Sequence, residues 1–170
     1  MKTVVFLGYS NSGKTFAIVS VVRELARAGS KVGTLKHIHE EGFTIDTQGK
    51  DTWRHAHAGA SMVVALAPDE MAIIQKKDTR RMTIDELTRI FAEDGVDYLL
   101  VEGLYRKLSR RRGVVRVLCA SSKEEVRDLL KVHPRPACIL GSGGLREKRV
   151  QGITVLKLPK DIGKLMELIR

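Results

Sequence analysis

The amino-acid sequence predicts an α/β fold in which a mostly parallel sheet is flanked by helices and carries an inserted β-hairpin. Short aliphatic runs of the kind found in buried strands alternate with segments whose apolar residues recur at helical spacing. A glycine-rich loop joins the first run to the first helical segment, and a turn containing Pro and Asp joins two later runs. This alternation is typical of a parallel sheet covered by helices. A length of 170 residues fits a single domain, residues 1–170.

The opening of the chain has the pattern of a βαβ unit. Residues 2–7 are expected to form a buried strand, residues 16–28 a helix stopped by Gly29, and residues 31–35 a second strand. Parallel strands joined through a helix cross over right-handed. The polar residues 36–50 that follow have no clear periodicity and suit a functional loop or lid.

The rest of the chain continues the alternation. A short helix at 51–59 precedes a predicted hairpin of strands 62–66 and 71–75. Capping patterns at 83–86 and 122–125 start two further helices, the second running to residue 132. The remaining expected elements are strands at 96–101, 114–120, 137–140 and 153–156 and a closing helix at 161–169.

Residues 8–15, Gly-Tyr-Ser-Asn-Ser-Gly-Lys-Thr, match the phosphate-binding pattern G-x-x-x-x-G-K-[ST] without a mismatch. They lie between the first strand and the first helix, which is the context that this P-loop motif requires. The glycines let backbone N–H groups face phosphate oxygens, Lys14 brings a charge to the β and γ phosphates, and Thr15 offers a hydroxyl to Mg²⁺. We therefore predict a P-loop NTPase-type sheet, with nucleotide-binding residues Gly8, Ser10, Asn11, Ser12, Gly13, Lys14 and Thr15.

Glu102 is the second candidate for chemistry because it follows the aliphatic run 96–101 and precedes Gly103. Ligands of open α/β sheets bind at the carboxyl ends of the strands. Glu102 is therefore predicted to hold Mg²⁺ or to orient an attacking water, with Lys14 as the other catalytic residue. The alternative is an exposed acid at a strand end. Asp97 enters the same strand from its other end and is the poorer candidate.

The loop after the second strand supplies Lys36, His37 and Asp46 at the same predicted edge of the sheet. We assign Lys36 and His37 to the nucleotide site and Asp46 to the metal, as a nucleotide sensor of the kind found in switch loops. Solvation at the surface explains Asp46 equally well. Two closely spaced histidine pairs invite a zinc interpretation, but their spacing is poor for joint ligation and no cysteine accompanies them.

A basic segment, residues 106–112, follows Gly103 and contains Arg106, Lys107, Arg110, Arg111 and Arg112. It suits a second anionic ligand, with Arg106 counted among the cofactor-binding residues, or else a solvated face. The segment lacks the aromatic side chains that stack nucleic-acid bases, which argues against a nucleic-acid partner. The glycine-rich residues 141–144 fit a base pocket and a plain turn equally well, and no Asn-Lys-x-Asp guanine signature is present.

The composition favours anionic partners, because 30 basic and 20 acidic residues leave a net charge of +10. No apolar run approaches the ~18 residues of a membrane span, so no membrane association is expected. The chain has two cysteines, each within an aliphatic run, which suits a reducing cytoplasm better than a disulfide framework.

Taken in order, these motifs resemble the MobB family, the molybdopterin-guanine dinucleotide biosynthesis protein B. The resemblance covers residues 4–117 and rests on the P-loop and on four later segments, residues 36–39, 46–52, 58–60 and 97–103. It implies a homodimeric GTP-binding protein that uses Mg²⁺, hydrolyses GTP slowly, and assists the guanylyltransferase that attaches GMP to the molybdenum or tungsten pterin cofactor. The residues alone also allow a small P-loop kinase or ligase acting on an anionic acceptor, or a nucleotide-dependent scaffold without turnover.

Overall fold

The computed structural model describes residues 1–108 and 111–170, with the backbone alone for Tyr105 and Arg106. The chain divides into two compact units, one made of Met1–His37 together with Ile84–Arg170 and the other of Ile38–Thr83. The expectation of one domain over residues 1–170 is not decided by this division and stays a prediction.

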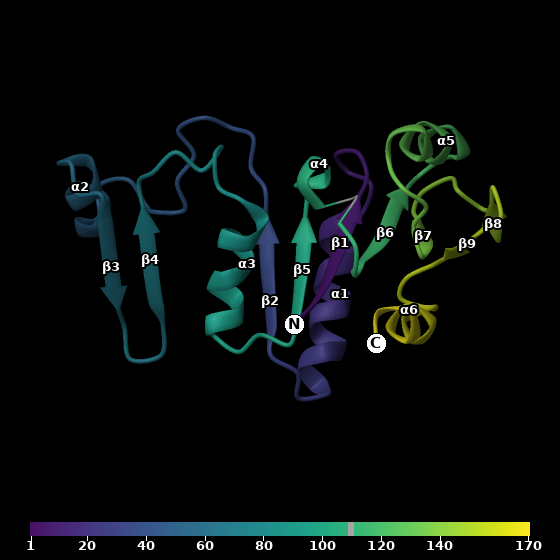
Figure 1. Cartoon of the computed structure of the whole chain (residues 1–170), viewed down its shortest axis with the longest axis horizontal. Coiled ribbons are helices and arrows are strands. Elements are labelled where there is room, and N and C mark those ends of the chain that lie inside the picture. The colour runs from purple at the N-terminus through teal and green to yellow at the C-terminus, as the bar shows by residue number, and fades with distance from the viewer. Residues whose placement is uncertain (109–110) are drawn as a thin grey trace. The chain divides into compact units, whose positions relative to one another are not determined.

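The larger unit is built on a seven-stranded sheet with the order β2-β5-β1-β6-β7-β9-β8 (Figure 1). Neighbouring strands are parallel except for β8, which pairs antiparallel with β9. The strands are β1 Lys2–Leu7, β2 Val32–Lys36, β5 Tyr98–Glu102, β6 Val114–Ala120, β7 Cys138–Gly141, β8 Arg149–Val150 and β9 Ile153–Leu156. Because six strands run the same way, their carboxyl ends meet at one edge of the sheet, and the loops that follow them share that edge.

Helices pack on both faces of this sheet because successive strand residues point to opposite sides. Val4 and Phe6 of β1 belong to one buried cluster, which includes residues of α1 (Lys14–Arg27) and α6 (Ile162–Ile169). Val5 and Leu7 belong to the other, with residues of α3 (Ile84–Glu93), α4 (Tyr105–Leu108) and α5 (Lys123–Val132). The aliphatic runs of the sequence are therefore strands buried on both faces.

Helix ends follow the predicted signals. The helix α1 ends at Arg27, and Gly29 adopts φ 79°, a conformation that glycine reaches without steric cost. Ser122 caps α5, its Oγ accepting a hydrogen bond of 3.2 Å from the Glu125 backbone N–H.

The smaller unit contains α2 (Asp51–His57) and the predicted hairpin, formed by β3 (Met62–Leu66) and β4 (Met71–Gln75). The two strands pair antiparallel, with Val64 opposite Ile73. In α2, the rings of Trp53 and His57 stack with their centroids 4.7 Å apart. The insertion of a β-hairpin into a mostly parallel α/β fold is thus confirmed.

Strand boundaries differ from the prediction in a way that matters for the site. The strands β2 and β5 end at Lys36 and Glu102, one residue later than the aliphatic runs indicate, because both polar residues still pair in the sheet. The short elements α4 and β8 were not predicted, since four and two residues are too few to show a period. Within the described residues, no helix has the length and apolar character needed to span a membrane.

Candidate functional site

The P-loop lies between β1 and α1, and β1 is flanked in the sheet by β5 on one side and β6 on the other. Gly13 is the N-cap residue of α1, with φ 90° and ψ 10°. It provides no side-chain cap, and the first turn of the helix contains no acidic residue. The first N–H groups of α1 are therefore left for another acceptor, and the positive end of the helix dipole favours an anion there.

Gly8 is required by the packing of the loop. A Cβ at this position would lie 2.4 Å from the Cys119 carbonyl oxygen and 2.5 Å from Ser12 Oγ, while φ is 149°. Ser12 itself is buried, with 3% of its surface exposed. The loop is thus pressed against β6 at a point where only glycine fits.

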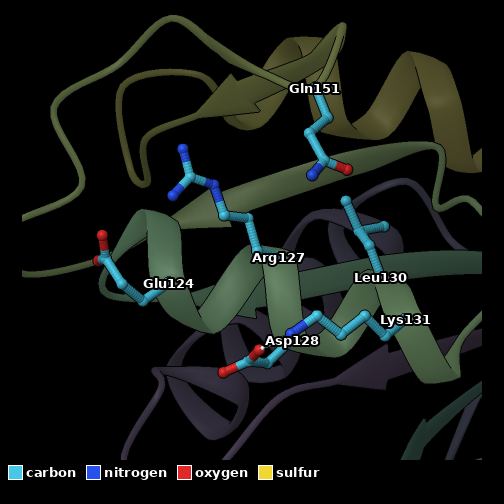
Figure 2. A pocket seen from close by; sticks show the side chains of 6 residues that line it. All are labelled: Glu124, Arg127, Asp128, Leu130, Lys131 and Gln151. Atoms are coloured by element: carbon cyan, nitrogen blue, oxygen red, sulfur yellow. Dashed lines mark hydrogen bonds and ion pairs between the residues drawn. The ribbon is translucent and has the colours of Figure 1, made fainter.

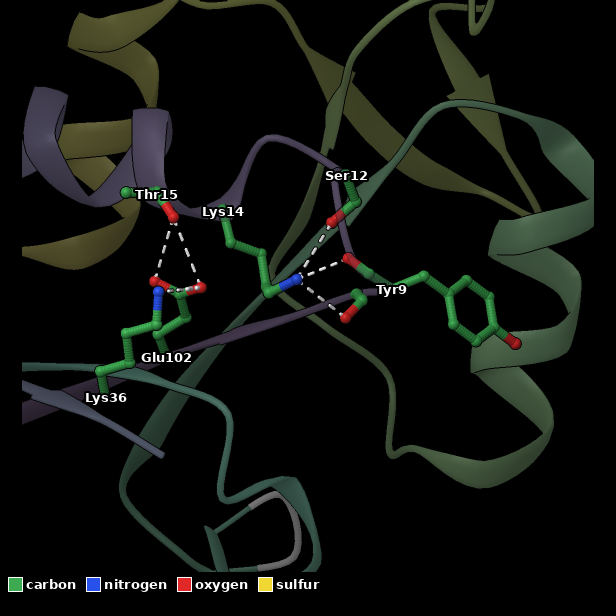
Figure 3. Close-up of polar contacts among 7 residues, drawn as sticks. Tyr9, Ser12, Lys14, Thr15, Lys36 and Glu102 are labelled. Carbon is green, nitrogen blue, oxygen red and sulfur yellow. Dashed lines mark hydrogen bonds and ion pairs between the residues drawn. The ribbon is translucent and has the colours of Figure 1, made fainter. Parts of the chain in front are cut away.

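Lys14 folds back across the loop. Its Nζ donates hydrogen bonds of 2.5 Å to the Tyr9 carbonyl and 3.1 Å to the Gly8 carbonyl (Figure 3). A third contact, 3.5 Å to Ser12 Oγ, is at the limit of a hydrogen bond. The ammonium group is therefore held at the mouth of the loop, beside the uncapped helix terminus.

On the other side of Lys14, the structure brings Thr15, Glu102 and Lys36 together (Figure 3). Thr15 Oγ1 donates to Glu102 Oε2 at 3.2 Å, with Oε1 at 3.4 Å. Lys36 Nζ lies 3.7 Å from Glu102 Oε1. The Glu102 side chain is 16% exposed and the Lys36 side chain 59% exposed, so the carboxylate is partly enclosed and the lysine is largely solvated.

A hydroxyl and a carboxylate oxygen within hydrogen-bond distance are the kind of donor set that Mg²⁺ uses when phosphates and water complete its coordination. The pair Thr15 and Glu102 fits that requirement. No group of three or more His, Cys, Asp or Glu side chains suited to a metal ion occurs in residues 1–108 and 111–170. A Mg²⁺ ion at this pair would therefore need further ligands, such as water or phosphate oxygens.

His37 lies next to this group through its backbone and Cβ. Its N–H donates to the Glu102 carbonyl at 2.9 Å, and a Cβ on Gly103 would lie 3.0 Å from the His37 Cβ. The loops leaving β2 and β5 are therefore in contact. A role for the imidazole in nucleotide binding stays a prediction.

Asp46 belongs to the smaller unit, and the structure shows what it does locally. Its Oδ1 accepts hydrogen bonds from the Thr47 N–H at 2.9 Å and from Thr52 Oγ1 at 3.0 Å, which fix the loop before α2. Its Oδ2 is shielded from solvent without a hydrogen-bond partner among the described residues. The predicted role of Asp46 as a metal ligand remains untested by these contacts.

Part of the basic segment is described. Leu108 is buried in the core and anchors α4, and Arg111 forms an ion pair of 2.5 Å with Asp85 at the start of α3. Lys107 and Arg112 are exposed. The side chain of Arg106 and the whole of Arg110 lie outside the described residues, so their predicted contribution to an anionic site stays a prediction.

The turn after β7, for which the sequence allows a base pocket or a plain turn, lies against the P-loop. Ser142 Oγ donates to the Ser12 carbonyl at 3.3 Å, and its N–H donates to the Ala120 carbonyl at 2.9 Å. The turn therefore borders the P-loop from the β6 side, whereas Glu102 borders it from the β5 side. No sequence signal links Ser142 to Ser12, because the contact depends on strand order.

Two other features are separate from this site. Burial raises the pKa of the Cys119 thiol to about 12, so the thiol stays protonated at neutral pH and is unsuited to act as a nucleophile. A surface pocket is formed by α5 and the turn between β8 and β9 (Figure 2). None of the predicted site residues lines it; the lining residues are Glu124, Arg127, Asp128, Leu130, Lys131 and Gln151.

Comparison with known proteins gives concordant matches. Residues 3–133 match the model of the family described as molybdopterin guanine dinucleotide synthesis protein B. The chain is 38% identical over 96 residues to a molybdopterin-guanine dinucleotide biosynthesis adapter protein of Haemophilus influenzae, a match that spans 56% of this chain and 53% of that protein. A relative from Methanocaldococcus jannaschii is 26% identical over 133 residues, which are 78% of this chain and 53% of the relative. The chain thus spans about half the length of these two curated relatives.

Solved structures agree on the fold. The crystal structure of Bacillus subtilis MobB superimposes with a TM-score of 0.79 over 100% of this chain and 99% of the other. The sequence identity in this comparison is 22%, so the likeness supports the architecture and carries no information about ligands.

Proposed function

Because the chain belongs to the molybdopterin guanine dinucleotide synthesis protein B (MobB) family, we propose that it is a Mg²⁺-dependent GTP-binding adapter in the biosynthesis of the molybdopterin guanine dinucleotide cofactor. The observation that carries the nucleotide part of this proposal is the convergence of Lys14, Thr15 and Glu102 at the uncapped N-terminus of α1. The guanine base and the pathway are proposed because of the family to which the chain belongs.

The residues of the site have distinct tasks in this proposal. Lys14 would exchange its carbonyl acceptors for β and γ phosphate oxygens, which are stronger acceptors because they are charged. The N–H groups at the start of α1 would hold the same phosphates. Thr15 and Glu102 would hold Mg²⁺, which when bound neutralises charge on the phosphate chain. Slow GTP hydrolysis, with Lys14 and Glu102 as the catalytic residues, is part of the proposal.

The strand order supports one direction for the proposed nucleotide. Glu102 and Thr15 would form the metal end of the site next to β5, and β1 separates β5 from β6. The γ phosphate would therefore lie toward β5, and the nucleoside would extend toward β6 and β7. Ser142 and the glycine-rich turn border the P-loop on that side, which suits a wall of the nucleoside pocket.

The proposed partners are the molybdopterin guanylyltransferase and the molybdenum or tungsten pterin cofactor, with a homodimer as the working form. The net charge of +10 supports an anionic partner. The basic segment after Glu102 is proposed as the rim that attracts the phosphate of the pterin or an acidic face of the transferase. The described exposed cations of this rim are Lys107, Arg112 and Arg111, the last of which forms an ion pair with Asp85.

A nucleotide-binding panel tests this function. The parent protein and Glu102→Gln are titrated with GTP, ATP and GDP, with and without Mg²⁺. We expect the parent to bind GTP with Mg²⁺ most tightly, and Glu102→Gln to lose most of the gain that Mg²⁺ provides, because the amide keeps the size of the carboxylate without its charge. If the parent binds all three nucleotides with the same affinity, with or without Mg²⁺, the proposal is contradicted.

The two alternative functions give different results in the same samples. A small kinase or ligase transfers the γ phosphoryl group to a small acceptor, which radiolabelled GTP or ATP detects. A scaffold binds the guanylyltransferase in a nucleotide-dependent way without any turnover. The adapter proposed here combines nucleotide-dependent binding to the transferase with slow release of phosphate.

A further inference from the structure

Lys36 is placed by the sheet at the metal end of the site. It is the last residue of β2, and in the parallel pairing of β2 with β5 it is the register partner of Glu102. The two residues occupy the same end of adjacent strands, and Lys36 Nζ lies 3.7 Å from Glu102 Oε1 (Figure 3). This distance describes two charges in contact rather than a well-formed hydrogen bond.

We propose that Lys36 is a specificity-determining residue that senses the γ phosphate of the nucleotide. This inference rests on the proposed Mg²⁺-dependent nucleotide binding. In the structure, the Glu102 carboxylate lies beside the Lys36 ammonium group and accepts a hydrogen bond from Thr15. When Glu102 and Thr15 receive Mg²⁺ with a triphosphate, Lys36 turns from the carboxylate to the γ phosphate.

The change of partner follows from electrostatics. Glu102 Oε1 faces Lys36, and both carboxylate oxygens face Thr15 Oγ1, so the ammonium group stands close to the position that suits a divalent ion. Two cations that share one carboxylate repel each other, and the repulsion is stronger in a partly enclosed site than in bulk water. The ammonium group must therefore leave when the carboxylate is used by the metal.

The Lys36 side chain is free to turn away from Glu102, and the γ phosphate would offer its ammonium group a nearby acceptor. Its side chain is 59% exposed and ends in a flexible four-carbon stem, so little packing is lost when it turns. A γ phosphate held at Thr15 and Glu102 together with Mg²⁺ would offer the ammonium group a new negative charge. A diphosphate has no γ phosphate, so with a diphosphate Lys36 loses Glu102 and gains no equivalent acceptor.

A second interpretation is a fixed ion pair that stabilises the end of an edge strand. A pair at 3.7 Å whose lysine is largely solvated contributes little to stability. The two interpretations differ in one measurable quantity, the ratio of triphosphate to diphosphate affinity. A fixed ion pair leaves this ratio unchanged when Lys36 is replaced.

Lys36→Met and Lys36→Arg test the proposal, with Lys31→Met as the matched control. Lys31 immediately precedes β2, at the strand end opposite to Lys36, and pairs with Asp94 at 2.9 Å, so the control also removes an ion pair of a largely exposed lysine. Calorimetric titrations give the dissociation constants for GTP and GDP at saturating Mg²⁺. A second series of titrations, with varied Mg²⁺, gives the Mg²⁺ concentration at which GDP binding is half-maximal.

For Lys36→Met, we expect GTP to bind at least about ten-fold more weakly and GDP to bind within about three-fold of the parent. The Mg²⁺ requirement for GDP should fall, because the competing ammonium group is gone. Lys36→Arg should recover part of the preference for GTP, and Lys31→Met should behave as the parent.

Equal weakening of GTP and GDP in Lys36→Met, or no change in either, would overturn the assignment of Lys36 while leaving the nucleotide site intact. A parent protein that does not bind any nucleotide would overturn the proposed function and this inference together. Circular dichroism of each variant separates these outcomes from misfolding.

Discussion

Gly8 shows how much the site depends on a single residue type. Its positive φ is only part of the reason, since Gly29 has φ 79° and a Cβ there would meet nothing within 4 Å. At Gly8 the added carbon would meet a backbone carbonyl of β6 at 2.4 Å, and backbone atoms of a buried strand cannot move aside cheaply. The glycine is therefore fixed by close approach of two elements, and the loop conformation depends on it.

We predict that Gly8→Ala lowers the free energy of unfolding by about 3 kcal/mol or more, because it adds a clash to the strain of the backbone angle. Gly29→Ala, which adds only the strain, should cost about 1–2 kcal/mol. Urea denaturation of both variants measures the difference. Similar stabilities for the two variants would mean that β6 and the loop can separate without cost.

At the residue scale, the sequence predicted the P-loop because its spacing and context are specific. It also placed Glu102 correctly at the carboxyl end of a strand. The contact of Lys36 with Glu102 could not be predicted from the sequence, because it requires two strands distant in the chain to pair in one particular register. The same holds for Ser142, whose hydrogen bond to the P-loop depends on the order of β1, β6 and β7 in the sheet.

The hairpin of β3 and β4 has an exposed apolar face. The side chains on one face of the hairpin are apolar and 48–78% exposed; they are Met62, Val64, Leu66, Met71 and Ile73. The register places Val64 opposite Ile73 and Leu66 opposite Met71, so these side chains form one continuous face. A two-stranded hairpin is marginally stable alone, and an exposed apolar face of this kind is typical of an interface.

We predict that this hairpin face lies in the interface of the proposed homodimer, where the same face of a second copy would cover it around a two-fold axis. Replacing Val64 and Ile73 together with Lys should convert the dimer to a monomer, because like charges would meet in the interface. Light scattering after size exclusion measures the mass. The control Asp69→Lys reverses a charge in the turn between the strands, which changes the net charge by as much as the double variant does, and it should remain dimeric. A double variant that keeps the mass of a dimer would exclude this face.

At the element scale, long or strongly patterned segments were predictable and short ones were not. The helix α5 was predicted from its capping pattern, and the bond between Ser122 and the Glu125 N–H confirms the reason. The strands β3 and β4 have the predicted bounds. The helix α4 owes its place to Leu108, which is buried in the core, rather than to any period in its four residues.

At the scale of the whole molecule, the parallel sheet sets the layout of the site. Placing β1 between β5 and β6 gives the P-loop a charged neighbour, Glu102, on one side and a small polar neighbour, Ser142, on the other. The proposed nucleotide site therefore has a metal end and a nucleoside end that are set by the strand order. The alternation of strands and helices predicted a parallel sheet, but the order of its strands came only from the structure.

Lys14→Ala tests most directly whether this edge of the sheet binds a nucleoside triphosphate. Lys14 contacts carbonyl and hydroxyl oxygens of the P-loop, so its removal deletes a cation aimed at phosphate without opening the core. Calorimetric titration with GTP and Mg²⁺ compares the parent, Lys14→Ala and the control Lys160→Ala, which removes an exposed lysine after β9. We predict that Lys14→Ala stays folded and loses about 2–5 kcal/mol of binding free energy, roughly thirty-fold or more in affinity, while the control binds as the parent does. A folded Lys14→Ala protein with the affinity of the parent for GTP and Mg²⁺ would contradict triphosphate binding at the P-loop.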